Sequence, residues 1–139
     1  MSLSIRNQLP GTVTSVTAGP AMATVQARLA GGQTITAAIT TDASTDLGLQ
    51  PGTAVHAVVK ATEVSLATGS VSGLSIRNQF PGRVTSVTPG AAMAAVKVAI
   101  EGGELTAAIT EQAAAELGLA PGTAVVALVK ATDVSLSTD

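Results

Sequence analysis

Apolar and polar residues alternate over several short stretches of this chain, and a period of two is typical of β-strands with one buried face. Residues 25–29 alternate strictly, and residues 53–60 place three valine or alanine side chains on one face. β-branched residues predict further strands over residues 13–17, 35–39 and 64–66. Turns are expected between these strands, at Gly19, Gly31-Gly32 and Pro51-Gly52.

The alternation breaks between the third and fourth predicted strands, over residues 40–48 and again over residues 110–118. The second stretch begins with Thr110, carries an acid at the next position, continues through alanines and ends at Gly118. These are the start and stop signals of a short helix. Thr40 and Thr110 have two compatible interpretations: each caps its helix, or each offers its hydroxyl to a ligand at the helix N-terminus.

The whole pattern occurs twice, and about two thirds of the aligned positions are identical, so the halves are two copies of one domain. We place the domains at residues 1–68 and 74–139, with a small, flexible linker over residues 69–73. The aligned segments are residues 3–32 with 74–103 and residues 34–68 with 104–138. Five short strands with one short helix per copy predict an all-β fold of two tandem OB-like small β-barrels.

The core of one copy would be thin. Hydrophobic residues make up 46% of the 139 residues, but most of them are alanine and valine, which bury little area each. A single repeat would therefore have marginal stability. We expect the two halves, or several chains, to bury surface against each other.

Charge and aromatic content argue against nucleic-acid binding. The formal net charge is -2, whereas nucleic-acid binders normally show a basic surface. Phe80 is the single aromatic residue, so the chain offers no platform for base stacking. The N-terminus lacks a basic segment followed by an apolar run, and no apolar stretch has the length of a membrane span. The sequence predicts a cytoplasmic protein that binds neither nucleic acid nor membrane.

One hexapeptide, residues 3–8, returns unchanged as residues 74–79. Ser4, Arg6 and Asn7 bring hydrogen-bond donors into one small region, which suits a small oxyanion. Lys60 lies at the end of a predicted strand, and we expect it to meet Arg6 across an interface with another domain. These two cations, with hydroxyls from Ser4 and Thr62, would hold a tetrahedral dianion. The other interpretation is that both cations are solvated or pair with Glu63 and Asp46.

The repeat sorts the seven basic residues into two groups. Both halves keep a basic residue at the positions of Arg6 and Lys60, where the second copy carries Arg77 and Lys130. This retention is only weak support for a functional role of these residues, because recently duplicated domains keep many identical residues by descent. Three basic residues have no basic twin and look like surface variation: Arg28, Arg83 and Lys97.

No catalytic arrangement is evident. His56 is the only histidine, and its twin is Val126, so we expect a surface or interface residue. The chain shows no nucleophile–base pair, no cleft with paired carboxylates and no nucleotide-binding fingerprint, which predicts that it is not an enzyme.

The loop over residues 17–23 recurs over residues 88–94 and has two interpretations. It is a plain turn followed by a packed strand, in which Met22 and Met93 fill gaps. Alternatively, its small residues let the backbone approach a ligand or another copy closely.

These segments together resemble the molybdopterin-binding-like (Mop) domain of the Mop/TOBE family, in the tandem form found in molbindins. The Ser-x-Arg-Asn opening, followed by glycine and valine, stands at residues 4–13 and 75–84. The Leu-Gly-Leu-x-x-Gly segment and the later Val-x-Lys-Ala-Thr-x-Val segment stand within residues 47–64 and 117–134. The match covers nearly the whole chain except the linker.

The resemblance implies OB-type barrels assembled as a homotrimer of tandem chains. It implies molybdate, and also tungstate, as a ligand held at domain interfaces for storage and homeostasis, with no catalytic cofactor. The alternative is a regulatory or sensor module that works with a molybdate transporter or regulator. Residue matching implies the ligands Ser4, Arg6, Asn7, Thr40, Lys60 and Thr62, with Ser75, Arg77, Asn78, Thr110, Lys130 and Thr132.

A second kind of site, which relies on backbone donors near the symmetry axis, is implied by the same resemblance. Its residues are Gly19, Ala21, Met22 and Ala23, with Gly90, Ala92, Met93 and Ala94. Glu63 and Asp133 follow the two binding threonines and would oppose an anion if they pointed inward.

Overall fold

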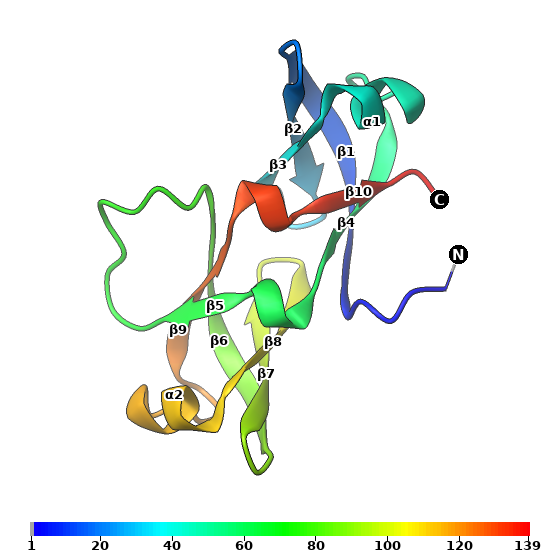
Figure 1. Cartoon of the computed structure of the whole chain (residues 1–139). Coiled ribbons are helices and arrows are strands. Elements are labelled where there is room, and N and C mark those ends of the chain that lie inside the picture. The colour runs from blue at the N-terminus through cyan, green and yellow to red at the C-terminus, as the bar shows by residue number, and fades with distance from the viewer. Residues whose placement is uncertain (1) are drawn as a thin grey trace.

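The computed structural model describes residues 2–139, so the Met1 boundary of the first predicted domain lies outside the described residues. The chain forms two five-stranded antiparallel sheets with two short α-helices (Figure 1). The elements of the first repeat are β1 (Asn7–Ala18), β2 (Met22–Leu29), β3 (Thr34–Thr40), α1 (Thr41–Asp46), β4 (Ala54–Val59), the 3-10 turn η1 (Ala61–Glu63) and β5 (Ser65–Ala67). The predicted all-β, OB-like fold is confirmed.

The second repeat forms the same elements in the same order. They are β6 (Asn78–Pro89), β7 (Met93–Ile100), β8 (Gly103–Thr110), α2 (Glu111–Glu116), β9 (Ala124–Val129), the 3-10 turn η2 (Ala131–Asp133) and β10 (Ser135–Ser137). The buried and exposed positions of β2 and β7 alternate strictly, as the sequence predicts.

The first strand is longer than predicted, because it begins at Asn7 rather than at Val13. Its first half pairs with β4 and its second half with β2, and the register with β2 shifts between Val13 and Ser15. Pro10 is tolerated inside β1 because the pairing with β2 begins only at Gly11, so only β4 flanks β1 at the proline. A side chain on Gly11 would meet the carbonyl oxygen of Arg28 at 2.8 Å, so this close approach requires glycine.

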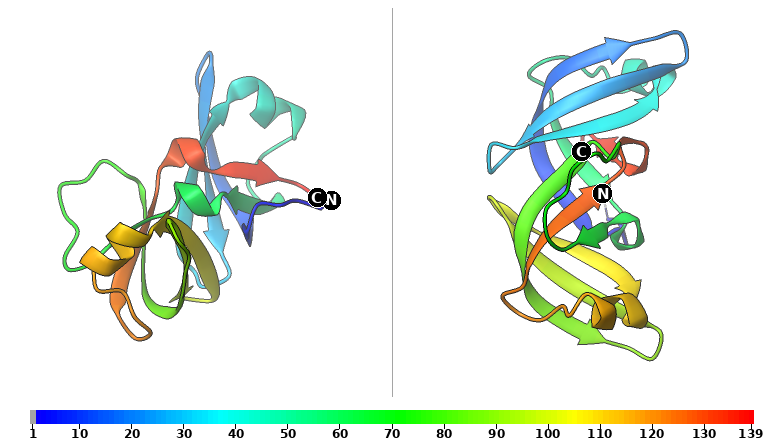
Figure 2. Two further views of the ribbon diagram at one scale, coloured as in Figure 1. Left: turned by 60° about the horizontal axis from the view of Figure 1, so that its bottom comes forward. Right: turned by 90° about the vertical axis from the view of Figure 1, so that its left-hand side faces the viewer.

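The last strand of each repeat joins the sheet of the other repeat (Figure 2). The sheet orders are β10-β4-β1-β2-β3 and β5-β9-β6-β7-β8. In the first sheet Leu136 of β10 lies opposite Ala57 of β4, and in the second Leu66 of β5 lies opposite Ala127 of β9. The two sheets therefore do not coincide with the two sequence repeats.

Further contacts join the repeats. The β2–β3 and β7–β8 hairpin tips touch so closely that a side chain on Gly31 would overlap the carbonyl oxygen of Glu101. Gln33 Nε2 donates to the same carbonyl at 2.8 Å. The buried side chains of both repeats form one hydrophobic cluster, with η2 against β3 and η1 against β8. The expectation that the halves bury surface against each other is confirmed.

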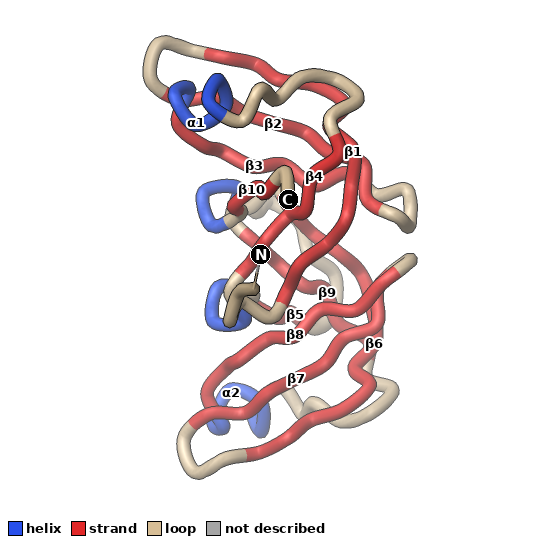
Figure 3. The backbone as a smooth tube through the Cα atoms, turned by 90° about the vertical axis from the view of Figure 1, so that its right-hand side faces the viewer, coloured by secondary structure: helices blue, strands red, loops and turns tan. Residues whose placement is uncertain are grey.

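The two α-helices lie far from the contacts that join the repeats. Figure 3 places α1 and α2 at opposite ends of the molecule, with η1 and η2 near the middle. Both predicted helices are confirmed, and each has a threonine N-cap whose hydroxyl accepts from the backbone N–H three residues later, at 3.1 Å. Among residues 2–139, no helix is long and apolar enough to cross a membrane.

Candidate functional site: an open cationic cavity

The register of β6 and β9 brings the candidate cations of the second repeat together. Asn78, the first residue of β6, lies opposite Val129, the last residue of β9. Arg77 directly precedes β6 and Lys130 directly follows β9, so the two residues lie side by side at one end of the sheet. The sequence predicted that Arg6 and Lys60 meet across an interface with another domain, whereas their counterparts Arg77 and Lys130 line one cavity within a single repeat.

An open cavity of about 240 Å³ lies at this end of the sheet. It holds two cationic side chains and two hydroxyls, and no carboxylate lines it. Four of its six lining residues are among the ligands predicted from sequence. The lining residues are Ser75, Ile76, Arg77, Lys130, Ala131 and Thr132. Two positive charges beside hydroxyl donors are suited to a small, doubly charged oxyanion.

The arginine is held by its own backbone. Arg77 Nε donates to the Ser75 carbonyl at 3.1 Å, and Arg77 Nη2 lies 3.5 Å from the Leu74 carbonyl. Within residues 2–139, Lys130 makes no ion pair or hydrogen bond through its side chain. Much of the donor capacity of both cations is therefore available to a ligand.

The first repeat places its residues in the same way. Asn7 lies opposite Val59, so Arg6 and Lys60 also lie side by side just beyond the paired ends. Arg6 Nε donates to the Ser4 carbonyl at 3.0 Å, as its counterpart does in the second repeat. Thr62 is exposed on η1.

A second cavity, of about 190 Å³, lies between the repeats and mixes charges. Lys60 contributes one cation to it, and Glu63 and Asp133 contribute one carboxylate each. Its full lining is Ile5, Val58, Lys60, Glu63, Thr132, Asp133 and Ser135. Thr132 lines both cavities, so they meet at η2. The sequence did not indicate Ser135, because no local pattern shows that β10 crosses to the first sheet. Ile5 lies in the repeated hexapeptide but was not among the predicted ligands.

Asn7 and Asn78 are buried and join the two repeats, and the ligand role predicted for them stays a prediction. Asn78 is 2% exposed, and its carboxamide donates to the Thr36 carbonyl at 2.8 Å and accepts from the Thr36 N–H at 2.7 Å. Asn7 makes the same pair of bonds with Thr106. Each carboxamide thus replaces a neighbouring strand at the edge of β3 or β8 and joins the two repeats.

The remaining candidates lie apart from these cavities. Thr40 and Thr110 cap their helices, and their role as ligands stays a prediction. Gly19 N–H donates to the Met22 carbonyl at 2.8 Å, and Gly90 repeats this with Met93, so these donors of the predicted second site close turns. Ala23 and Ala94 are buried in the core, whereas Met22 and Met93 are about half exposed. Thr41 and Glu111 donate their N–H groups to the carbonyls of Ala21 and Ala92.

His56 lies where the repeats meet, opposite Ser137 of β10, as expected for an interface residue. In the part of the chain that the structure describes, residues 2–139, no group of three or more histidine or acidic side chains is arranged to hold a metal cation.

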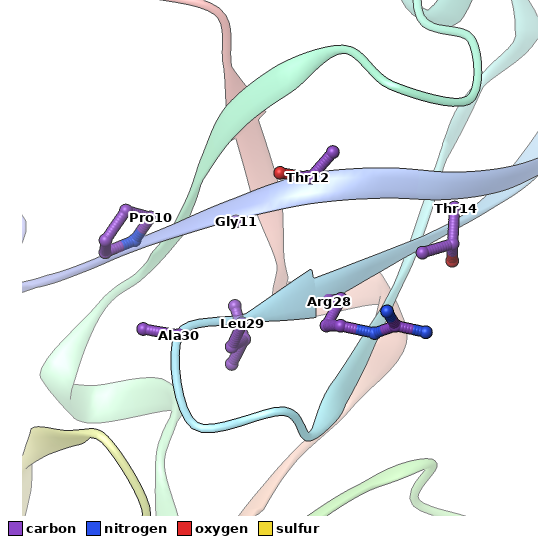
Figure 4. A pocket seen from close by; sticks show the side chains of 7 residues that line it. All are labelled: Pro10, Gly11, Thr12, Thr14, Arg28, Leu29 and Ala30. Carbon is purple, nitrogen blue, oxygen red and sulfur yellow. The ribbon is translucent and has the colours of Figure 1, made fainter.

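A wider groove of about 550 Å³ runs over the Pro10-Gly11 step of β1 (Figure 4). None of the candidate ligands lines this groove, and Arg28 is its charged residue. Arg28 and Arg83, which have no basic twins, occupy related positions in the two sheets. Arg28 lies opposite Thr12 and Arg83 lies opposite Ala99, so one guanidinium occupies the same cross-strand pair in each repeat.

The fold and the site define a class: a duplicated small-barrel protein with cations and hydroxyls gathered at the strand ends beside the junction of its repeats. The TOBE domain model matches residues 3–66 and again residues 74–136, so the chain belongs to the TOBE-domain family. The tandem Mop arrangement expected from the resemblance is confirmed.

Its relatives include molybdenum proteins. The chain is 40% identical to the molybdenum-pterin-binding protein MopA of Rhodobacter capsulatus, over 99% of the chain and 52% of that protein. It is 38% identical to the molybdenum transport protein ModE of Herbaspirillum seropedicae, over 94% of the chain and 49% of that protein. The chain therefore spans about half the length of these relatives.

One solved structure matches the chain from end to end. It is the cytoplasmic molybdate-binding protein ModG in a crystal form with molybdate bound. The TM-score is 0.96 and the sequence identity is 41%, over 99% of both chains. These relatives are named as binding and transport proteins.

Proposed function

We propose that this chain binds molybdate, and also tungstate, and stores or buffers the oxyanion. The observation that carries this proposal is the cavity in which Arg77 and Lys130 stand beside the hydroxyls of Ser75 and Thr132. The likeness to ModG, described with molybdate bound, supports the choice of oxyanion.

Binding would rest on direct hydrogen bonds from fixed donors. The guanidinium and the ammonium supply charge-assisted bonds, and the hydroxyls supply neutral ones. Such bonds strengthen when water is excluded, so burial of the open cavity against another chain would increase affinity. The corresponding first-repeat residues are Ser4, Arg6, Lys60 and Thr62. Further candidate ligands are Thr40, Thr110 and the loops at Gly19–Ala23 and Gly90–Ala94.

We also propose that three chains assemble, that the protein acts in the cytoplasm and that it is not an enzyme. The described residues expose 7317 Å², against about 6,500 Å² expected for a compact monomer of this mass. The excess surface supports assembly. Each 1–68 and 74–139 segment would remain a domain in the evolutionary sense, although the last strands are exchanged.

Isothermal titration calorimetry tests the proposal. Molybdate and tungstate are expected to give saturable heats with micromolar protein, while sulfate, a smaller tetrahedral dianion, gives a weaker signal. The absence of heat with molybdate and tungstate would reject the function.

A sensor role is the second candidate. It is suggested by the match to ModE, a molybdenum transport protein, over 94% of this chain and 49% of that protein. A pull-down in which a transporter or regulator subunit is recovered at fixed stoichiometry, dependent on molybdate, would favour this role over storage.

A further inference from the structure

The two cavities that meet at η2 differ in the sign of their charge. Two cations and no carboxylate line the cavity of Arg77 and Lys130. One cation and two carboxylates line the cavity of Lys60, where the acids are Glu63 and Asp133. Thr132 lines both cavities, so the acids lie close to any anion bound at this threonine.

Lys60 is the one cation that lines the same cavity as the two carboxylates, among the described residues. In the chain from residue 2 to residue 139, neither Glu63 nor Asp133 makes a hydrogen bond or an ion pair through its side chain. Glu63 is exposed and Asp133 is half-buried, and within residues 2–139 neither carboxylate has a cation in contact. The repeats contribute one acid each, at equivalent positions.

From this arrangement, and resting on the proposed function, we propose that Glu63 and Asp133 make the site discriminate between anions by their charge. The two carboxylates weaken the binding of a dianion more than that of a monoanion of the same shape. Coulomb repulsion is proportional to the charge of the ligand, so a fixed carboxylate costs a dianion twice the free energy that it costs a monoanion. The cations attract both ligands in the same proportion. The acids therefore limit affinity for molybdate and favour its release.

The test removes the two charges without changing side-chain shape. Glu63→Gln combined with Asp133→Asn is compared with the wild type by calorimetry, using molybdate as the dianion and perrhenate as a tetrahedral monoanion. Molybdate affinity is expected to rise on the order of ten-fold in the double variant. Perrhenate affinity is expected to rise by about the square root of that factor, roughly three-fold, because its charge is half as large.

Asp46→Asn combined with Glu116→Gln is the matched control. It makes the same two chemical changes and the same change in net charge at the last residues of α1 and α2, at opposite ends of the molecule (Figure 3). Screening at physiological salt, over about 8 Å, should leave both affinities of this control near the wild-type values.

The outcomes are distinguishable. Unequal gains that vanish as salt is raised support the selection. Equal gains for the two ligands, no gain, or the same gain in the control overturn it. If the wild type binds no molybdate, the proposed function is rejected. In that case the proposed charge selection is rejected as well, unless the double variant binds molybdate.

Discussion

At the scale of single residues, the paired asparagines show that one side chain can substitute for a strand. The carboxamide of Asn78 presents one donor and one acceptor to Thr36, in the way that a backbone neighbour would. This blunts the free edge of β3, which would otherwise be open to pairing with another chain. The neighbouring Arg77 is thereby fixed at the strand end where the cavity opens.

Asn78→Ala is expected to lower the free energy of unfolding by about 2–3 kcal/mol, because it leaves a backbone donor and acceptor of Thr36 without partners. Urea unfolding followed by circular dichroism measures this loss. Gln79→Ala is the control, since its exposed side chain makes only one local hydrogen bond, to the Ile76 carbonyl, and should cost well under half as much. Equal losses in the two variants would contradict the role assigned to Asn78.

Removal of both site arginines should separate binding from assembly. Arg6→Ala combined with Arg77→Ala is expected to abolish molybdate binding at micromolar protein, while native mass spectrometry shows the same oligomer as the wild type. Arg28→Ala combined with Arg83→Ala removes the same charge from exposed positions outside the cavity and should retain binding. Wild-type affinity in the first double variant would reject the site.

At the scale of elements, the exchange of β5 and β10 makes each sheet depend on the other repeat. Leu136 reaches Ala57 in the first sheet, and Leu66 reaches Ala127 in the second. Both leucines are partly buried against the common hydrophobic cluster. Disturbing the last strand of one repeat should therefore loosen the sheet of the other.

Leu136→Ala is expected to accelerate amide hydrogen exchange in β4, in the first repeat, more than in β9. Leu66→Ala is the mirror control and should accelerate exchange in β9 more than in β4. Mass spectrometry of peptic peptides from each strand provides the readout. The opposite assignment, in which each substitution loosens its own repeat, would show that the strands are not exchanged.

The sequence predicted which residues share a face better than which strands are neighbours. Alternation over residues 25–29 and 53–60 specified buried faces, and Thr40 and Thr110 marked the helix starts. A period of two, however, is the same whichever sheet a strand joins, so the exchange of β10 could not be deduced.

The candidate site was predicted in the same partial way. The repeated hexapeptide and the conserved pattern of the two halves singled out Arg77 and Lys130, which the structure brings together in one cavity. Chemistry alone could not separate a ligand carboxamide from a structural one, because Asn78 has donors and acceptors suited to either role. The cavity that joins Lys60 to Asp133 depends on contacts between repeats, which local sequence does not specify.

At the scale of the whole molecule, the surface shows where other chains would pack. Met22 and Met93 are repeat equivalents and are 49% and 46% exposed, the highest values among the large hydrophobic residues of the described chain. Each follows the tight turn that begins at Gly19 or Gly90. We expect these side chains to lie at contacts between subunits.

Met22→Glu combined with Met93→Glu is therefore expected to convert the proposed trimer to monomers, because burying the introduced carboxylates is costly. Native mass spectrometry and sedimentation velocity measure the change. Thr68→Glu combined with Thr138→Glu adds the same charges at exposed equivalent positions and should leave the trimer intact. A trimer that persists in the methionine variant would exclude this contact.

The exchanged strands also govern the order in which the chain matures on the ribosome. Most proteins complete an N-terminal domain while later residues are still being synthesised. Here the first sheet lacks its fifth strand until residues 135–137 have left the exit tunnel, which requires the second repeat to be synthesised first. The nascent first half must therefore keep one edge of β4 unpaired until β10 has been synthesised.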